Sequence, residues 1–471
     1  MSGARKEGRL MVAGDGPKGV NVRQRVAVVG CGHVGVVTAA CLAELGHQVV
    51  GVDINKALID GLRAGKVPFV EPGLMDLVVT NTGLGRLSFT TSYQEALAGA
   101  GFVFLCVNTP STAAGAADLR YVRGAVAQIA GALSASNDRP LIVNKSTSPI
   151  GTGETIEAIL GQTFQGKGDR PPIAANPEFL REGSAVYDFF HAERIVIGAD
   201  SLEDARGVAA LYEGIDVPII LTDIRTAEMV KYVSNAFLAT RVSFVNEIAQ
   251  LCEHLGIDID VVVRGVSLDP RIGSAFFKPG IGYGGSCLPK DVAAMRHTGN
   301  SVGVAMRVLS SVQEVNIAQR GRAVSSIRRL LGPLEGLTVA AWGATFKGGS
   351  EDLRESPALD VITLLRNEGA RVKVYDPALV AASSVDFADE ICGDALEAAR
   401  GAHCVAILTD WPEFADVDLD EVRRLMAGHL LYDGRNLLRR SDVEAAGLTY
   451  CGVGRPPTLD SSRVAEVQHV R

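Results

Sequence analysis

The chain has 471 residues, 47% of them hydrophobic and 21% charged, so it has enough apolar material for two or three globular domains. Its net charge of −8 gives no electrostatic footprint for nucleic acid or an anionic membrane. The eight cysteines are scattered without a CxxC pair and no apolar run has the length of a membrane span, so we expect no disulfide framework, metal site or transmembrane helix.

Both ends of the chain are expected to lack regular secondary structure. Residues 1–23 are basic and Gly-rich without an apolar core segment, so we expect a disordered extension rather than a signal peptide, and a cytoplasmic protein. Residues 455–471 are expected to form a flexible tail.

Residues 24–222 have the pattern of an NAD-binding Rossmann domain. An apolar strand at 25–30, a helix to about residue 45 and a second strand at 48–53 form a βαβ unit. Further apolar runs alternate with helical stretches, which predicts a mostly parallel sheet covered by helices; these runs are 102–107, 141–144, 173–175 and 194–197.

A helical middle at 223–330 precedes a second α/β domain at 331–454. Residues 226–255 form a helical pattern unbroken by Gly or Pro, about 45 Å long, which could join two domains and offer a dimerisation face. In the second domain, a helix is expected to begin at the pair Ser356-Pro357. The strands expected there are 338–342, 371–375, 404–408 and 430–432. The predicted fold is α/β, with two Rossmann-like lobes that contain parallel sheets joined by a long central helix.

The run from Gly30 to Gly35, with Val34 inside it, fits the dinucleotide fingerprint G-x-G-x-x-G between a strand and a helix. Gly30 would form the tight turn, Gly32 would admit the pyrophosphate and Gly35 would let helix and strand pack closely. Asp53 ends the second strand, where a carboxylate accepts a hydrogen bond from a ribose hydroxyl and disfavours a 2′-phosphate. We therefore expect NAD rather than NADP. A Gly-rich turn without a ligand is the alternative, which this context disfavours.

Polar residues follow two later strands and one predicted helix start. Thr109 and Thr147 come after strands, at the sheet edge where ligands bind, although simple turns would also use threonine. Residues 176–183 read as a cap, a first-turn proline and a short helix that would place Glu178 and Glu182 on one face. Such acids could act as bases, or could simply favour the helix dipole.

Two further pairs have one-turn spacing. Lys231 and Asn235 share a face of the long helix, although a solvated lysine is the commoner case. Cys287 and Asp291 lie at a predicted helix start after a Gly-rich turn, with Ser286 as a possible cap. A thiol there, next to Lys290, would have a depressed pKa and could capture an aldehyde, whereas a buried structural cysteine is the alternative.

At this point the residues resemble the UDP-glucose 6-dehydrogenases of the UDP-glucose/GDP-mannose dehydrogenase family, over about residues 24–450. The motifs that carry the resemblance occur in the family's order; they are 30–35, 71–74, 176–183, 231–238, 269–273, 284–291, 346–347, 354–357 and 433–435.

The resemblance implies catalytic roles. Cys287 would be the nucleophile that forms a thiohemiacetal and then a thioester. Lys231, with Asp291 and a water as partners, would stabilise the oxyanion and could serve as base, and Asn235 would steady the thiohemiacetal oxygen. Glu178, with a water held by Thr147, would be the base for thioester hydrolysis.

The resemblance also implies binding residues. Thr147, Glu182, Lys290 and Arg354 would join the fingerprint in holding NAD. Arg271 would reach the sugar of a neighbouring subunit, which implies a homodimer with a shared site. The substrate UDP-glucose would contact a set that also includes Glu178, Lys231 and Asn235; its other members are Phe179, Leu180, Phe276, Lys278, Gly280, Gly284, Lys347 and Arg435.

Two positions depart from the family pattern: His33 stands where tyrosine is common, and Leu58 stands where Lys or Arg often supports the adenosine ribose. Enzymes for GDP-mannose share the Gly-Gly-Ser-Cys run and are the alternative, whereas those for UDP-N-acetylmannosamine usually have histidine before the cysteine. An idle NAD-binding scaffold would have lost chemical residues, and all those named above are present.

Overall fold

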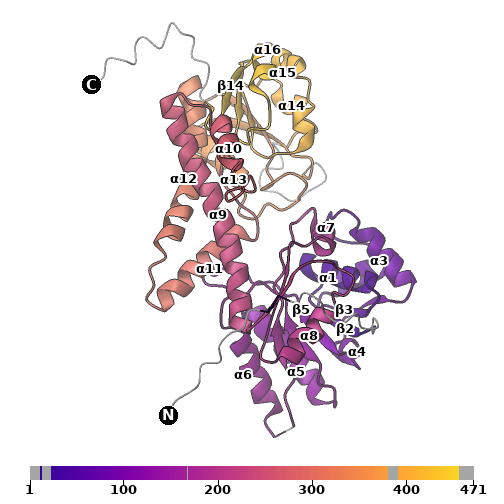
Figure 1. The fold of residues 1–471 in the computed structure, drawn as a ribbon. Helices are drawn as coiled ribbons and strands as arrows, with labels where there is room; N and C mark the ends of the chain where they lie inside the picture. Colours follow the sequence, from indigo (N-terminus) through magenta and orange to yellow (C-terminus); the bar gives the residue numbers. More distant parts are fainter. Residues whose placement is uncertain (1–10, 13–22, 167, 380–390, 456–471) are drawn as a thin grey trace. The chain divides into compact units, whose positions relative to one another are not determined.

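The computed structural model describes residues 11–12, 23–166, 168–379 and 391–455. The chain divides into two compact units, Met1–Ser234 with Ala293–Val304, and Asn235–Val292 with Ala305–Arg471. This division differs from the three domains expected at 24–222, 223–330 and 331–454, because the helical middle is shared between the two units. Figure 1 shows the elements of each unit.

The first unit is built on a nine-stranded sheet with the order β1-β9-β8-β7-β6-β5-β2-β3-β4. Among these strands, only the pairs β1–β9 and β7–β8 are antiparallel. The prediction of a mostly parallel sheet is therefore confirmed. The strands are β1 (Met11–Val12), β2 (Arg25–Val29), β3 (Gln48–Val52), β4 (Leu87–Thr90), β5 (Phe102–Leu105), β6 (Leu141–Asn144), β7 (Ile173–Ala175), β8 (Ile195–Ala199) and β9 (Ile219–Thr222). Disorder was expected for residues 1–23, but Met11–Val12 form β1, which pairs with Ile220 and Leu221. Residues 1–10 and 13–22 lie outside the described residues.

Helices cover both faces of this sheet, which explains why its central strands are mostly apolar. Along β2, Val26 and Val28 face one hydrophobic core, whereas Ala27 and Val29 face the other. The helices of this unit before residue 224 are α1 (His33–Glu44), α2 (Lys56–Arg63), α3 (Leu74–Gly83), α4 (Tyr93–Leu97), α5 (Arg120–Ser134), α6 (Thr152–Phe164), α7 (Ala185–Phe190) and α8 (Leu202–Ala210).

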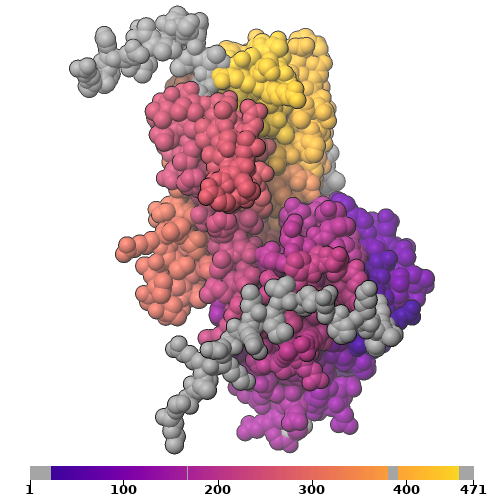
Figure 2. All heavy atoms as spheres, in the orientation of Figure 1, coloured from indigo at the N-terminus to yellow at the C-terminus, as the bar shows by residue number. Residues whose placement is uncertain are grey.

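The long helix α9 spans Ile224–Leu255, as the unbroken pattern predicted, and ends before Gly256, whose φ of +69° suits glycine at a helix end. Its first part belongs to the first unit and the remainder to the second. In the second unit α9 lies beside α12 (Arg307–Leu331), where Ser243 Oγ donates to the Val312 carbonyl at 2.8 Å. The second unit's α10 (Ile259–Ser267) lies on the face that Figure 2 shows. Helix α11 spans Leu288–Ser301.

The second unit contains a fully parallel five-stranded sheet with the order β11-β10-β12-β13-β14. Its strands are β10 (Thr338–Trp342), β11 (Arg371–Tyr375), β12 (Cys404–Ile407), β13 (Leu430–Asp433) and β14 (Thr449–Gly452). Its helices include α13 (Pro357–Asn367), α14 (Ala395–Ala399), η2 (Pro412–Ala415), α15 (Leu419–Leu425) and α16 (Arg440–Ala445). The predicted fold, two Rossmann-like lobes with a long central helix, is confirmed. Among the described residues, no helix has both the length and the hydropathy to cross a membrane.

Candidate active site

The three fingerprint glycines have distinct surroundings in the first unit. Gly30 has φ +94°, and a Cβ there would lie 2.6 Å from the Cys106 carbonyl oxygen. A Cβ on Gly35 would lie 1.8 Å from the Gly30 carbonyl oxygen, so helix α1 can approach β2 only with glycine at this position. By contrast, no atom lies within 4 Å of a Cβ on Gly32. The turn is therefore closed on its protein side and open at the start of α1.

The open side of this turn suits an anionic ligand. Gly32 is the N-cap of α1, and neither a capping side chain nor a first-turn acid occupies the N-terminus. The backbone N–H groups there are thus available to a diphosphate. Asp53 follows β3, is half-buried and accepts hydrogen bonds from the amides of Cys31 (2.8 Å) and Asn55 (2.9 Å). Asp53 is thereby held beside the turn, and these residues together fit NAD.

The loops after β5 and β6 are tied together at the carboxyl edge of the sheet. Thr109 Oγ1 donates to the Thr147 carbonyl, and the Val107 amide donates to Ser146 Oγ at 2.9 Å. Thr147 Oγ1 in turn donates to Glu178 Oε1 at 3.1 Å. Thr109 and Thr147, which were predicted to follow strands, therefore form one connected group with Glu178.

Glu178 forms a buried ion pair with Lys231 of α9. Lys231 Nζ lies 3.1 Å from Glu178 Oε1, and both side chains are 5% exposed. The ammonium also lies 5.3 Å from the centre of the Phe179 ring. Burial acts to raise the pKa of Glu178, but Lys231, the Leu180 amide and Lys145 outweigh it and hold this pKa below its usual value. Glu178 is therefore an ionised carboxylate at neutral pH.

The short helix predicted at 176–183 is wrong. Residues 176–181 are an irregular loop, so Glu178 and Glu182 do not share a helix face. Side-chain acceptors replace helical bonds here: Glu178 Oε2 accepts from the Leu180 amide at 2.7 Å, and Asp188 accepts from the Arg181 amide at 2.9 Å. Phe179 and Leu180, both predicted substrate residues, lie in this loop.

Asn176 anchors the start of this loop instead of capping a helix. Its amide nitrogen donates to the Val196 carbonyl at 2.9 Å, and its Oδ1 accepts from Lys145 Nζ at 3.1 Å and from the Tyr212 hydroxyl at 2.5 Å. All of these groups are buried. Sequence reasoning assigned Lys145 no role; its place directly after the strand Leu141–Asn144, which begins with three apolar residues, is the signal that could have indicated its burial.

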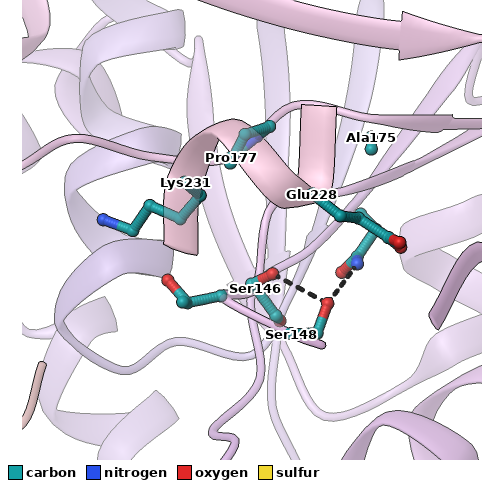
Figure 3. A pocket seen from close by; sticks show the side chains of 8 residues that line it. Ser146, Ser148, Ala175, Pro177, Glu228 and Lys231 are labelled. Carbon is teal, nitrogen blue, oxygen red and sulfur yellow. Dashed lines mark hydrogen bonds between the residues drawn. The ribbon is translucent and has the colours of Figure 1, made fainter. Parts of the chain in front are cut away.

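A small pocket of about 200 Å³ lies beside this group, between α9 and the loops after β6 and β7. Figure 3 shows Lys231 and Glu228 pointing in opposite directions from α9. Glu228 accepts from the amides of Gly151 (2.8 Å) and Gly153 (2.9 Å) at the start of α6, and burial raises its pKa to about 7. Sequence reasoning missed Glu228, although an acid one turn before Lys231 on an apolar helix was a visible signal.

In the second unit, Cys287 lies at the start of α11. Its carbonyl accepts from the Asp291 amide at 3.0 Å, so Cys287 rather than the predicted Ser286 occupies the capping position. All eight cysteines lie in the described part of the chain, and Cys287 is the exposed one. The predicted placement of a thiol at a helix N-terminus is confirmed.

Asp291, one turn after Cys287 on α11, is fully buried and is held on both sides. Asn235 Nδ2 donates to one carboxylate oxygen at 2.6 Å, and Lys290 Nζ donates to the other at 2.6 Å. Lys290, expected to contact NAD, thus has its ammonium on Asp291. Lys231 and Asn235 are four residues apart on the continuous helix α9, as predicted.

The predicted substrate residues of the second unit lie around the Gly-rich turn and the end of β13. Arg435 donates to the carbonyls of Leu408 (2.7 Å), Gly282 (3.2 Å) and Phe346 (3.1 Å), so it joins three loops. Gly280 lies against this arginine: a Cβ there would lie 3.2 Å from the Gly434 carbonyl oxygen. A Cβ on Gly284 would lie 2.1 Å from the Glu355 carbonyl oxygen.

The remaining predicted residues of this unit are more exposed. Arg271 and Arg354 each pair with an aspartate two residues earlier, Asp269 and Asp352. Lys347 Nζ lies 5.6 Å from the centre of the Phe346 ring. Lys278 is exposed, and Phe276 combines exposure with a φ of +55°, a strained backbone for a bulky side chain.

Comparison with known proteins agrees with this geometry. The sequence models of the UDP-glucose/GDP-mannose dehydrogenase family match its NAD-binding domain at residues 24–216, its central domain at 225–318 and its UDP-binding domain at 340–440. The chain belongs to this family.

Similar proteins cover nearly the whole chain. The chain is 40% identical to the UDP-glucose 6-dehydrogenase TuaD of Bacillus subtilis, over 92% of this chain and 94% of the relative. It is also 40% identical to a UDP-glucose 6-dehydrogenase of Rhizobium meliloti, over 92% of this chain and 100% of that protein. A solved UDP-glucose dehydrogenase from Pyrobaculum islandicum superposes with a TM-score of 0.85 at 38% identity, over 94% of this chain and 100% of that one.

Proposed function

We propose that this protein is an NAD-dependent UDP-glucose 6-dehydrogenase that converts UDP-glucose, two NAD⁺ and water to UDP-glucuronate and two NADH. The observation that carries the proposal is the exposed Cys287 at the start of α11, one turn before an Asp291 held by Asn235 and Lys290. An alcohol dehydrogenase needs no such thiol, whereas oxidation through an aldehyde to an acid does. We place the reaction in the cytoplasm, the reducing compartment that scattered cysteines favour.

In the proposed mechanism, NAD⁺ when bound would supply the hydride acceptor for each of the two oxidations. The Gly30–Gly35 turn would hold its diphosphate and Asp53 its ribose, with contributions from Thr109, Thr147, Glu182, Lys290 and Arg354. The Asp53 carboxylate would repel the 2′-phosphate of NADP.

The covalent steps are assigned to Cys287. Its sulfur attacks the aldehyde carbon and forms a thiohemiacetal, whose oxygen Asn235 and Lys231 would stabilise. Loss of a hydride from this carbon gives a thioester. Glu178, ionised and hydrogen-bonded to Thr147, would take a proton from the water that attacks the thioester, and the cysteine would leave as thiolate or thiol.

The choice of sugar nucleotide rests on the relatives. Those named above act, by name, on UDP-glucose, and the third family domain is described as UDP-binding. The basic residues of the second unit that we assign to the two phosphates are Lys278, Lys347 and Arg435. Because the family name also covers GDP-mannose enzymes, the same reaction on GDP-mannose is the second candidate.

We also propose a homodimer through α9. Large apolar side chains lie exposed along this helix, among them Val233, Phe237, Phe244 and Leu251. A row of such side chains on one helix is typical of an association surface. The exposed side chain of Arg271 would then reach the sugar that is bound by the neighbouring subunit.

The deciding experiment measures NADH formation with UDP-glucose, GDP-mannose and UDP-N-acetylmannosamine, each with NAD⁺ and with NADP⁺. We expect turnover with UDP-glucose and NAD⁺, and two NADH per sugar at completion. A higher kcat/KM for GDP-mannose would overturn the substrate, and one NADH per sugar would overturn the four-electron reaction.

A further inference from the structure

Glu71 is a buried carboxylate that joins two segments of the first unit. Its Oε2 accepts from His33 Nε2 at 2.8 Å and from the Gly183 amide at 2.9 Å. Its Oε1 accepts from the Ala185 amide at 2.7 Å. The Glu71 side chain is 0% exposed. A buried carboxylate needs such donors to offset its lost hydration, so the contacts hold both segments in place.

The two segments carry different parts of the site. His33 is the first residue of α1, directly after Gly32, where the dinucleotide's diphosphate would lie. Gly183 lies near the end of the loop that carries Glu178, Phe179 and Glu182, and Ala185 is the first residue of α7. Glu71 therefore links the cofactor turn to the loop of the acids.

The loop is also held at its start and in its middle, where Glu178 contacts Thr147 and Lys231. At its start, Asn176 bonds to Val196, Lys145 and Tyr212, none of which belongs to the cofactor turn. The end of the loop has its own local contact between Arg181 and Asp188. Among the hydrogen bonds of the described residues, those of Glu71 to His33 and Gly183 are the ones that join the cofactor turn to this loop.

We propose that Glu71 is a positioning residue that, through His33, couples dinucleotide binding at the cofactor turn to the order of the loop 176–184, so that dinucleotide and UDP-sugar increase each other's affinity. A ligand that fixes the start of α1 also fixes His33, whose ring holds the Glu71 carboxylate toward Gly183 and Ala185. Coupling of this kind is reciprocal and typically about 5- to 150-fold. Since one hydrogen bond to a carboxylate carries it here, we expect roughly tenfold.

The test compares variants of His33, because Glu71→Ala would leave two buried amides without acceptors and endanger the fold. His33→Leu removes the donor to Glu71 and keeps both backbone bonds. His33→Gln keeps an N–H donor at similar reach. His254→Leu is the matched control, since His254 contacts only the carbonyl one turn earlier on α9 among the contacts described for it.

The measurement is the Kd of UDP-glucose by calorimetry, without and with saturating NADH, a pair that cannot react. In the wild type, His33→Gln and His254→Leu, we expect NADH to tighten UDP-glucose binding roughly tenfold. In His33→Leu the effect should fall below about twofold, while the Kd without NADH stays near wild type. The melting temperature should fall, because the buried Glu71 carboxylate loses one donor.

Two results would overturn the coupling: no effect of NADH in the wild type, or the same effect in His33→Leu. The inference rests on the proposed function. If UDP-glucose does not bind the wild type at all, both the inference and the proposed function are overturned. Binding with unchanged coupling in His33→Leu would remove this inference and leave the proposed function standing.

Discussion

Lys231 Nζ and Glu178 Oε1 lie 3.1 Å apart, each on a side chain that is 5% exposed. Lys231, which is assigned to stabilise the oxyanion, and Glu178, which is assigned as the base for hydrolysis, thus neutralise each other's charge in the absence of substrate. This pairing was not foreseen, because the sequence placed the two residues on separate elements and gave Lys231 an aspartate as partner. A buried pair is costly to break from one side, since the remaining charge stays buried.

Lys231→Met should therefore destabilise the protein as well as inactivate it. We expect the free energy of unfolding of the first unit to fall by about 3 kcal/mol, and the double variant Lys231→Met with Glu178→Gln to recover most of this loss. Guanidinium unfolding at pH 7 checks both. A loss below about 1 kcal/mol in the single variant would contradict a buried pair.

The raised pKa of Glu228 predicts that the stability of the protein depends on pH between about pH 5 and 7. Its pKa is raised to about 7 by burial, so between its ordinary value and pH 7 the unfolded chain loses the proton while the folded protein keeps it. Its stabilising contribution is therefore present at low pH and is lost as pH rises toward 7. The free energy of unfolding, measured for the wild type and for Glu228→Gln, should decline less steeply from pH 5 to 7 in the variant.

Glu203→Gln is the control for this comparison, because Glu203 is an exposed first-turn acid of α8. It should keep the wild-type decline. Equal slopes in Glu228→Gln and wild type would show that Glu228 titrates as an ordinary glutamate.

Strands and glycine turns could be predicted because their signals are local. The strands at 141–144, 173–175, 338–342 and 371–375 have the predicted bounds, since buried parallel strands are short apolar runs between polar turns. Strands β4 and β9 were not predicted, and β4 alternates apolar and polar residues near the sheet edge.

The site was harder, because its decisive contacts join residues far apart in the chain. The local signals at Asn176 and Pro177 favoured a helix start, but Lys145, Tyr212 and Val196 claim the Asn176 side chain. The role of Glu71 depends on partners 38 and 112 residues away. Local spacing cannot reveal such partners, whereas Cys287 at a helix start was readable from its Gly-rich turn.

Asp53 predicts cofactor selectivity. We expect kcat/KM for NAD⁺ to exceed that for NADP⁺, and Asp53→Ala to narrow the gap because the repulsion of the 2′-phosphate is gone. Asp53→Asn is the companion variant, since it removes the charge and keeps one acceptor oxygen for either the Cys31 or the Asn55 amide. Equal kcat/KM for both cofactors in the wild type would refute the role.

The apolar row on α9 predicts the assembly. Light scattering at micromolar concentration should give a dimer, and Phe237→Glu, at a side chain 60% exposed, should shift it toward monomer. The matched change Tyr187→Glu, at an aromatic 60% exposed on α7, should leave the mass unchanged. A fully active wild-type monomer would remove both the dimer and the shared role of Arg271.

Cys287→Ser tests the covalent mechanism. A serine hydroxyl is a poorer nucleophile than a thiolate, and an ester leaves less readily than a thioester, so the variant should stall after its first steps. We expect steady-state turnover to fall by orders of magnitude while UDP-glucose and NAD⁺ still bind. Cys392→Ser, at a half-buried cysteine near β11, should keep wild-type turnover.

A thiol reagent gives independent evidence on the same residue. Because Cys287 is the exposed cysteine, iodoacetamide should alkylate it first and abolish turnover in step with labelling, and bound UDP-glucose should slow both. Mass spectrometry of peptides identifies the labelled position. Turnover near the wild-type rate in Cys287→Ser, or after complete alkylation of Cys287, would show that no covalent intermediate is needed, and the assignment of a thiol-dependent four-electron oxidation would fall even though the family and fold stand.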